Sequence, residues 1–67
     1  MLSIHLNGEK QGLERPLSLQ EILEQFEIRR EAVAVAVNAE VIPRSELSKT
    51  KVRDGDRIEI IHAVGGG

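Results

Sequence analysis

The apolar part of this sequence is almost entirely aliphatic, because Phe26 is the only aromatic residue and there is no cysteine. A chain of 67 residues forms one small domain, and such a domain buries only about 60% of the surface that its unfolded chain exposes. Small domains often add disulfides or a structural metal. Without cysteine and with two histidines, neither a disulfide framework nor a Cys/His zinc site can form. We therefore expect a core of closely packed aliphatic side chains.

The chain is slightly acidic, with a formal net charge of −2 at pH 7. Nucleic-acid-binding domains carry clustered basic residues, but the only adjacent basic pair here, Arg29 and Arg30, is flanked by Glu27 and Glu31. No apolar run approaches the roughly 20 residues that span a bilayer, and residues 1–9 lack the basic start and apolar block of a signal peptide. We expect a cytoplasmic protein that binds neither nucleic acid nor membrane.

Residues 2–7 alternate between aliphatic and polar side chains, a period of two that is typical of a half-buried strand. The Asn7-Gly8 dipeptide supplies the positive φ angles of a tight hairpin. A second strand is expected over about 11–15, where Pro16 ends it because proline cannot donate a ladder hydrogen bond. The chain therefore begins with a β-hairpin.

Two signals predict a helix over 19–26. Ser18 and Glu21 have the spacing of a capping box, in which the Ser18 side chain accepts from the Glu21 amide and the Glu21 side chain reaches back. Four apolar residues at i, i+3, i+4 and i+7 form one face of the helix, namely Leu19, Ile22, Leu23 and Phe26.

The segment 32–37 contains only alanine and valine. Its valines recur at every second position, and β-branching favours a strand. A wholly apolar run indicates a strand covered on at least part of both faces. Because Asn38 tolerates a left-handed turn, Val41 and Ile42 are expected to fold back as a short partner strand before Pro43.

The segment 43–47 is expected to form a single helical turn, with proline at its start. Leu47 and Val52 are expected to enter the core. Residues 54–56, Asp-Gly-Asp, predict a turn, and the aliphatic segment 57–62 predicts a last strand.

These elements define an α+β fold. A hairpin, one helix and further strands require a mixed sheet with the helix across one face. A right-handed crossover then allows the last strand to lie beside the first, parallel to it, in the centre of the sheet. This is the β-grasp, or ubiquitin-like, fold. We expect the domain to span 1–64 and a flexible glycine tail, 65–67, to project beyond the sheet.

The last three residues, Gly65, Gly66 and Gly67, carry the functional hypothesis. Such a tail is often a frayed terminus or an expression scar, but here it follows a predicted central strand without a linker or tag. Glycine allows close backbone approach in a narrow channel and leaves the terminal carboxylate accessible. That carboxylate is an anion at neutral pH, so it must be activated, for instance as an acyl-adenylate. The chain has no phosphate-binding glycine loop, so a partner enzyme must supply the ATP chemistry.

No side-chain constellation predicts catalysis by the chain itself. The Asp-Gly-Asp segment 54–56 lacks the ligand spacing of a calcium loop. His5 has no candidate partner, and His62 is interpreted as an exposed histidine at a strand end. Neither a nucleophile triad nor a pair of carboxylates stands out. We therefore expect no catalytic residue, no metal site and no enzyme activity.

The sequence resembles the sulfur carrier proteins of thiamine biosynthesis along essentially its whole length. The resemblance rests on five segments in order: Ala-Val-Ala-Val-Asn ending at Asn38, Val41-Ile42-Pro43-Arg44, Asp54-Gly55-Asp56, the strand into His62-Ala63-Val64, and the final Gly66-Gly67. The third glycine, Gly65, is a minor departure.

That resemblance implies a carrier that acts as a co-substrate of other enzymes. A ubiquitin-activating-like adenylyltransferase would form an acyl-adenylate on Gly67 from ATP. A persulfide from a cysteine desulfurase or rhodanese-like donor would then convert it to a thiocarboxylate, and a thiazole synthase would take the sulfur. Val64, Gly65 and Gly66 would form, with Gly67, the tail that enters the partner sites. The chain itself would bind no cofactor.

Three alternatives remain open at this point: a small subunit of molybdopterin synthase, a ubiquitin-like modifier joined to lysines through Gly67, and an interaction domain with an idle tail. The surface that selects the partner is expected to be an exposed aliphatic patch on the sheet face opposite the helix.

Overall fold

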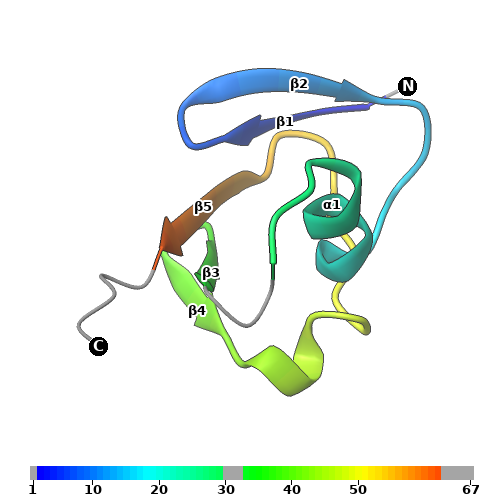
Figure 1. Ribbon diagram of the computed structural model, residues 1–67. Coiled ribbons are helices and arrows are strands. Elements are labelled where there is room, and N and C mark those ends of the chain that lie inside the picture. The colour runs from blue at the N-terminus through cyan, green and yellow to red at the C-terminus, as the bar shows by residue number, and fades with distance from the viewer. Residues whose placement is uncertain (1, 30–32, 63–67) are drawn as a thin grey trace.

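The computed structural model describes residues 2–29 and 33–62. Its elements are, in order, β1 (Leu2–Leu6), β2 (Glu9–Leu13), α1 (Leu19–Gln25), β3 (Val33–Val37), β4 (Glu40–Ile42), the 3-10 helix η2 (Arg44–Glu46) and β5 (Arg57–His62). The five strands form one sheet in the order β2-β1-β5-β3-β4, and α1 lies against one face of it (Figure 1).

Strand β5 lies in the centre of the sheet, as predicted. It runs parallel to β1, with Leu6 beside Ile58, and antiparallel to β3, with Val35 beside Ile60. The outer pairs, β1 with β2 and β3 with β4, are antiparallel hairpins. The expected mixed sheet is therefore confirmed. The predicted boundary between the domain 1–64 and the tail 65–67 lies outside the described residues.

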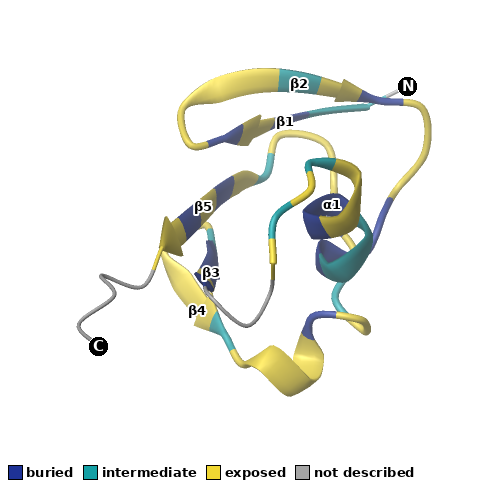
Figure 2. Ribbon diagram, viewed as in Figure 1, coloured by how far each residue is buried: buried dark blue, intermediate teal, exposed yellow. Residues whose placement is uncertain are grey.

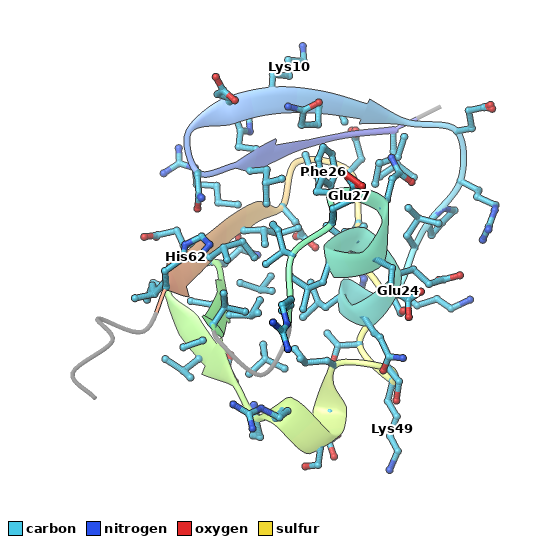
Figure 3. The ribbon with its side chains drawn as sticks, viewed as in Figure 1. Lys10, Glu24, Phe26, Glu27, Lys49 and His62 are labelled. Carbon is cyan, nitrogen blue, oxygen red and sulfur yellow. The ribbon has the colours of Figure 1, made fainter. Side chains whose placement is uncertain are left out.

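The core lies between α1 and the sheet, where Figure 2 shows the buried residues of both. Ile4 and Ile22 are fully buried, and Leu47 and Val52, the two residues expected to enter from the segment after η2, are each 2% exposed. The buried side chains of the cluster are all aliphatic: Ile4, Leu6, Leu13, Leu17, Leu19, Ile22, Leu23, Val33, Val35, Leu47, Val52, Ile58 and Ile60. Phe26 packs against this cluster from its edge (Figure 3).

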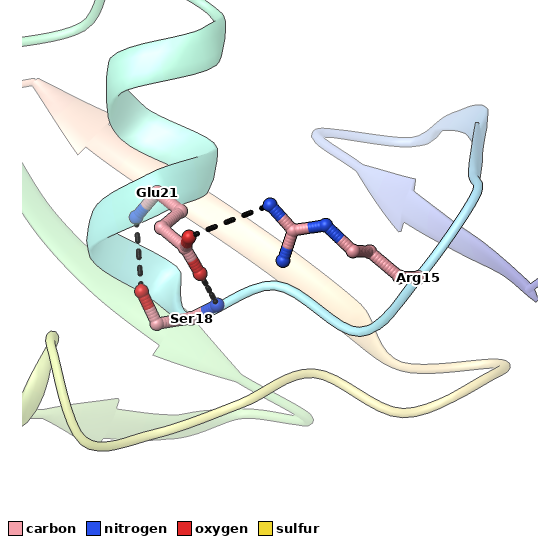
Figure 4. Close-up of polar contacts among 3 residues, drawn as sticks. All are labelled: Arg15, Ser18 and Glu21. Carbon is pink, nitrogen blue, oxygen red and sulfur yellow. Dashed lines mark hydrogen bonds and ion pairs between the residues drawn. The ribbon is translucent and has the colours of Figure 1, made fainter.

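The predicted capping box begins α1. The Glu21 amide donates to Ser18 Oγ at 3.1 Å, and the Ser18 amide donates to Glu21 Oε1 at 2.9 Å (Figure 4). Arg15 Nη2 lies 3.8 Å from Glu21 Oε2. The helix ends at Gln25, with Phe26 as its C-cap, one residue before the predicted end.

Within the described ranges, no helix is long and apolar enough to cross a bilayer.

The prediction of the second strand was wrong by two residues at each end. It spans Glu9–Leu13 and not 11–15, because the turn at Asn7-Gly8 has only two residues and pairing resumes at once, with Leu6 beside Glu9. Pro16 therefore follows the strand end without causing it. Only Leu13 is buried on this edge strand, so its apolar pattern could not locate it.

The all-apolar segment forms β3 from Val33; Ala32 lies outside the described residues. Val33 and Val35 are buried on the helix side, whereas on the opposite side Ala36 is buried and Ala34 is exposed. The strand is therefore covered on one face and on part of the other, as predicted.

Both hairpins turn through two residues with positive φ. Asn7 and Gly8 have φ angles of 50° and 85°, and Asn38 and Ala39 have φ angles of 51° and 72°. Positive φ at both positions is the type I′ turn, which matches the twist of the flanking strands. The left-handed conformation at Asn38 was predicted. Ala39, however, occupies the position that glycine fills in the first hairpin, where its Cβ makes the conformation unfavourable.

We therefore expect Ala39→Gly to raise the free energy of unfolding by about 1 kcal/mol, since the relief of strain exceeds the added entropy of the unfolded chain. Urea unfolding measures this. Gly8→Ala should lower stability, because its φ is 85° although no atom lies within 4 Å of the added Cβ. Gly12→Ala, equally uncrowded, is the control without positive φ. A less stable Ala39→Gly variant contradicts this account.

The capping box makes stability depend on pH. The hydrogen bond from the Ser18 backbone, helped by the nearby Arg15 charge, lowers the pKa of Glu21 below its ordinary value despite some desolvation. A carboxyl group whose pKa is lowered by folding stabilises the protein when the pH is above its ordinary pKa. This stabilisation is lost as the pH falls through the pKa of the folded state. In Glu21→Gln the amide keeps the capping hydrogen bond but not the charge.

We therefore expect wild type to be more stable than Glu21→Gln at neutral pH, and the difference to disappear in acid. Urea unfolding at a series of pH values measures this. Glu24→Gln, on the same helix but outside the capping box, is the matched control. A stability difference that stays constant with pH would rule out the charge as its source.

Candidate functional site

The predicted functional residues come shortly after the central strand in the sequence. Val64, Gly65, Gly66 and Gly67 lie outside the described residues, so their roles stay predictions. The last described residue, His62, ends β5 and is exposed (Figure 3). What the structure does describe is how the strand before these residues is held.

The start of β5 is held by the β3–β4 turn. The Asn38 amide donates to Arg57 O at 2.8 Å, and the Arg57 amide donates to Asn38 Oδ1 at 3.0 Å. Asn38 Nδ2 also donates to Asp56 Oδ1 at 3.1 Å, while the other oxygen of Asp56 accepts from the Arg53 amide at 2.8 Å. The asparagine therefore extends the β3–β5 ladder by one position and joins it to the preceding turn.

The turn that precedes β5 is also joined to β1, through Asp54. The Ser3 amide donates to Asp54 Oδ1 at 2.7 Å, and the Gly55 amide donates to Ser3 O at 2.7 Å. Gly55 has a φ of 88°, a conformation that favours glycine. The interpretation of Asp54-Gly55-Asp56 as a turn is therefore confirmed, and its two carboxylates connect β5 to both halves of the sheet.

Asn7 holds the middle of β5 from the side of β1. Its amide donates to Ile58 O at 2.9 Å, and its side-chain Oδ1 accepts from the Ile60 amide at 2.8 Å. The backbone has already turned into the hairpin at Asn7, so the side chain replaces the acceptor that a longer β1 would provide. The sequence pattern predicted only a turn residue here, because its partner lies 53 positions away.

We expect Asn7→Gly to lower the free energy of unfolding by about 1 kcal/mol, because the part-buried Ile60 amide loses its acceptor. Glycine keeps the positive φ but adds entropy to the unfolded chain, so exchange of the Ile60 amide is the measurement that isolates the lost acceptor. Asn7→Asp retains an acceptor oxygen and is the matched control. Urea unfolding and exchange of the Ile60 amide measure the effect; an Ile60 amide that stays equally protected in Asn7→Gly contradicts the role.

The sheet face opposite α1 carries the exposed aliphatic patch that was expected. Val41 is 64% and Ile61 is 52% exposed. Ile61 pairs with Ala34 and Val41 with Ala36. Their chain neighbours Val35 and Ile60 are buried on the helix side. The patch therefore lies over β3, β4 and the end of β5. Its role in selecting a partner stays a prediction.

A hollow in the described surface and the absence of a metal-ligand cluster among the described residues complete the account of possible sites. A shallow hollow of about 550 Å³ lies beside the β1–β2 turn and the first half of β5, and its lining residues are His5, Asn7, Gly8, Arg57, Ile58 and Glu59. Across residues 2–29 and 33–62, no group of three or more His, Asp or Glu side chains is placed to hold a metal ion.

A mixed five-stranded sheet crossed by one helix, with its last strand central and parallel to its first, is the β-grasp architecture. The chain belongs to the ThiS family, whose family model matches residues 4–67. This is a family of small sulfur carrier proteins and not of catalysts. The expected family and fold are therefore confirmed.

Individual relatives agree with this assignment. The sulfur carrier protein ThiS of Thermus thermophilus is 36% identical over 96% of this chain and 98% of its own length. The crystal structure of the thiamine biosynthesis protein ThiS from Geobacter metallireducens superposes with a TM-score of 0.87 at 30% identity, covering 98% of this chain and all of that one. A thiazole synthase of Paramagnetospirillum magneticum is 30% identical over 98% of this chain, which corresponds to 20% of that protein.

Proposed function

We propose that this protein carries sulfur as a thiocarboxylate on Gly67 and delivers it for the thiazole moiety of thiamine. The observation that carries the proposal is the family match, which extends to residue 67 and so includes the terminal glycines. Relatives named sulfur carrier protein ThiS span nearly the same length. The protein then acts as a co-substrate, and the chemistry takes place on its partners.

The first step activates the Gly67 carboxylate. On an adenylyltransferase of the ubiquitin-activating type, a carboxylate oxygen attacks the α-phosphate of ATP, pyrophosphate leaves, and an acyl-adenylate forms. The terminal sulfur of a persulfide, held by a cysteine desulfurase or rhodanese-like protein, then attacks the acyl carbon and displaces AMP. A thiol attacks the inner sulfur of the resulting acyl persulfide, so that a disulfide forms and the thiocarboxylate is released. The proposed location of this chemistry is the cytoplasm, where ATP is available.

The chain's own contribution is presentation. The hydrogen bonds of Asn38, Asp56 and Asn7 hold β5, the strand that leads toward the tail 65–67. The absence of cysteine supports a carrier, because no internal thiol can capture the activated acyl group. Glycines without Cβ fit a tail that enters a narrow partner channel.

The proposed recipient of the sulfur is a thiazole synthase. In Paramagnetospirillum magneticum, a protein named thiazole synthase contains a segment similar to nearly all of this chain as one fifth of its own length. A second thiazole synthase, from Magnetococcus marinus, has the same relation at 35% identity. A carrier and a synthase that share one chain are held at high effective concentration, which supports a direct transfer between the two.

The proposal is tested by mass spectrometry of the protein incubated with its adenylyltransferase, ATP and a persulfide donor. We expect replacement of one oxygen by sulfur on Gly67, and transfer of that sulfur into the thiazole when the synthase is added. A chain lacking Gly67 is the control and should stay unmodified. Conjugates to lysine residues would indicate a modifier, sulfur delivery only to molybdopterin would indicate the other carrier class, and an unmodified terminus would falsify the proposal.

A further inference from the structure

Strand β5 is paired along only part of its length on one side. Toward β3 it makes five residue pairs, from Ile58 beside Val37 to His62 beside Val33. Toward β1 it makes two, His5 beside Arg57 and Leu6 beside Ile58. In Figure 1, β1 turns back into β2 while β5 continues past it. The central strand of the sheet therefore becomes an edge strand in its last residues.

Hydrogen-bond directions identify the open backbone groups. The amides and carbonyls of alternate residues of a strand point to opposite sides. Arg57 faces β3, since it exchanges hydrogen bonds with Asn38, so Ile58, Ile60 and His62 face the side of β1. Ile58 O and the Ile60 amide are satisfied by Asn7. The next two groups on that side, Ile60 O and the His62 amide, have no strand partner among the described residues.

Asn7 marks where this open edge begins. Its side chain completes the ladder at the Ile60 amide, so an added strand has a defined starting position immediately after it. Ile61 borders the open edge on the outer face of the sheet and is 52% exposed. An incoming strand with an aliphatic side chain beside Ile61 would remove this apolar surface from water.

The other edges of the sheet are less suited to pairing. The outer edge of β2 carries the charged residues Glu9 and Lys10, both exposed, and Lys10 points away from the sheet (Figure 3). Charged side chains on an edge oppose pairing with another strand. Strand β4 has only three residues. Neither edge lies on the strand that precedes the proposed sulfur attachment point.

We propose that an extended segment of the thiazole synthase pairs with the open edge of β5 at Ile60–His62, adding a strand where β1 ends. This inference rests on the proposed function, because the synthase is chosen as the protein that receives the tail. The thiazole synthases that contain a similar domain favour it over the adenylyltransferase as the occupant. Strand addition uses main-chain hydrogen bonds, so pairing at this edge aligns the chain with the synthase without requiring particular side chains in the tail.

The test removes the His62 amide while leaving the rest of β5 paired. His62→Pro lacks the N–H on the open side, and the preceding Ile61 is already extended, as a residue before proline prefers. His62→Ala removes the imidazole and keeps the N–H. We expect His62→Pro to bind the synthase about tenfold or more weakly than wild type in calorimetric titration, and His62→Ala to bind as wild type does. Thermal unfolding checks that both variants fold.

Amide exchange gives a second measurement on the unmodified chain. Adding the synthase should slow exchange of the His62 amide, whereas the Ile61 amide, which faces β3, should be protected with and without the synthase. The inference is overturned if the synthase does not bind wild type, or if it binds wild type and His62→Pro equally. It is also overturned if both variants bind the synthase equally weakly, or if His62→Pro weakens binding to the adenylyltransferase and not to the synthase. Formation of the thiocarboxylate on both variants is scored separately, so a failure of the proposed function is distinguished from a failure of this contact.

Discussion

The sheet consists of two hairpins that are joined only through β5. Strands β1 and β2 form one hairpin and β3 and β4 the other, and the order β2-β1-β5-β3-β4 leaves no direct contact between them within the sheet. An isolated hairpin is at best marginally stable in water. Burial of Ile58 and Ile60 against the helix side and the two ladders along β5 therefore hold the fold together. The strand that joins the hairpins is also the one that leads to the proposed tail.

Polar side chains determine where this strand begins and how far it is paired. Asn38 and Asp56 connect its first residue to the β3–β4 turn, Asp54 connects the preceding turn to β1, and Asn7 completes the ladder at Ile60. Three of these four residues belong to segments on which the family resemblance rests. Their shared role is to anchor β5, and none of them has a chemical role of its own in the proposed sulfur transfer.

Local patterns were sufficient for much of the fold. The capping box of Ser18 and Glu21 and the 3.6-residue spacing of the apolar face located α1, because both signals lie within a few residues of each other. The strand order followed from the sequence of elements and the handedness of crossovers. The bounds of β2 were wrong because an edge strand with one buried residue has almost no apolar period. The Ile60 contact of Asn7 could not be predicted, since neither residue contains information about a partner so distant in the chain.

Some features of the candidate site were likewise predictable from the sequence, and others were not. The terminal glycines were identified from the sequence, but the described structure ends at His62 and does not test them. The open backbone edge beside them was not predicted, because strand propensity says nothing about which side of a strand stays unpaired. The exposed aliphatic patch was expected in general terms, but its residues, Val41 and Ile61, depend on the register of β3, β4 and β5.

The position of β5 has a consequence for synthesis of the protein. The strand that joins the two hairpins follows the other four strands in the sequence, so the native sheet cannot form on the ribosome until residues 57–62 have emerged from the exit tunnel. Many of the contacts that define the fold join residues far apart in the chain, and such contacts form late in folding. A prematurely terminated chain has no central strand and no native core. Until residues 57–62 are made, the two hairpins have no strand to join them, and the core lacks Ile58 and Ile60.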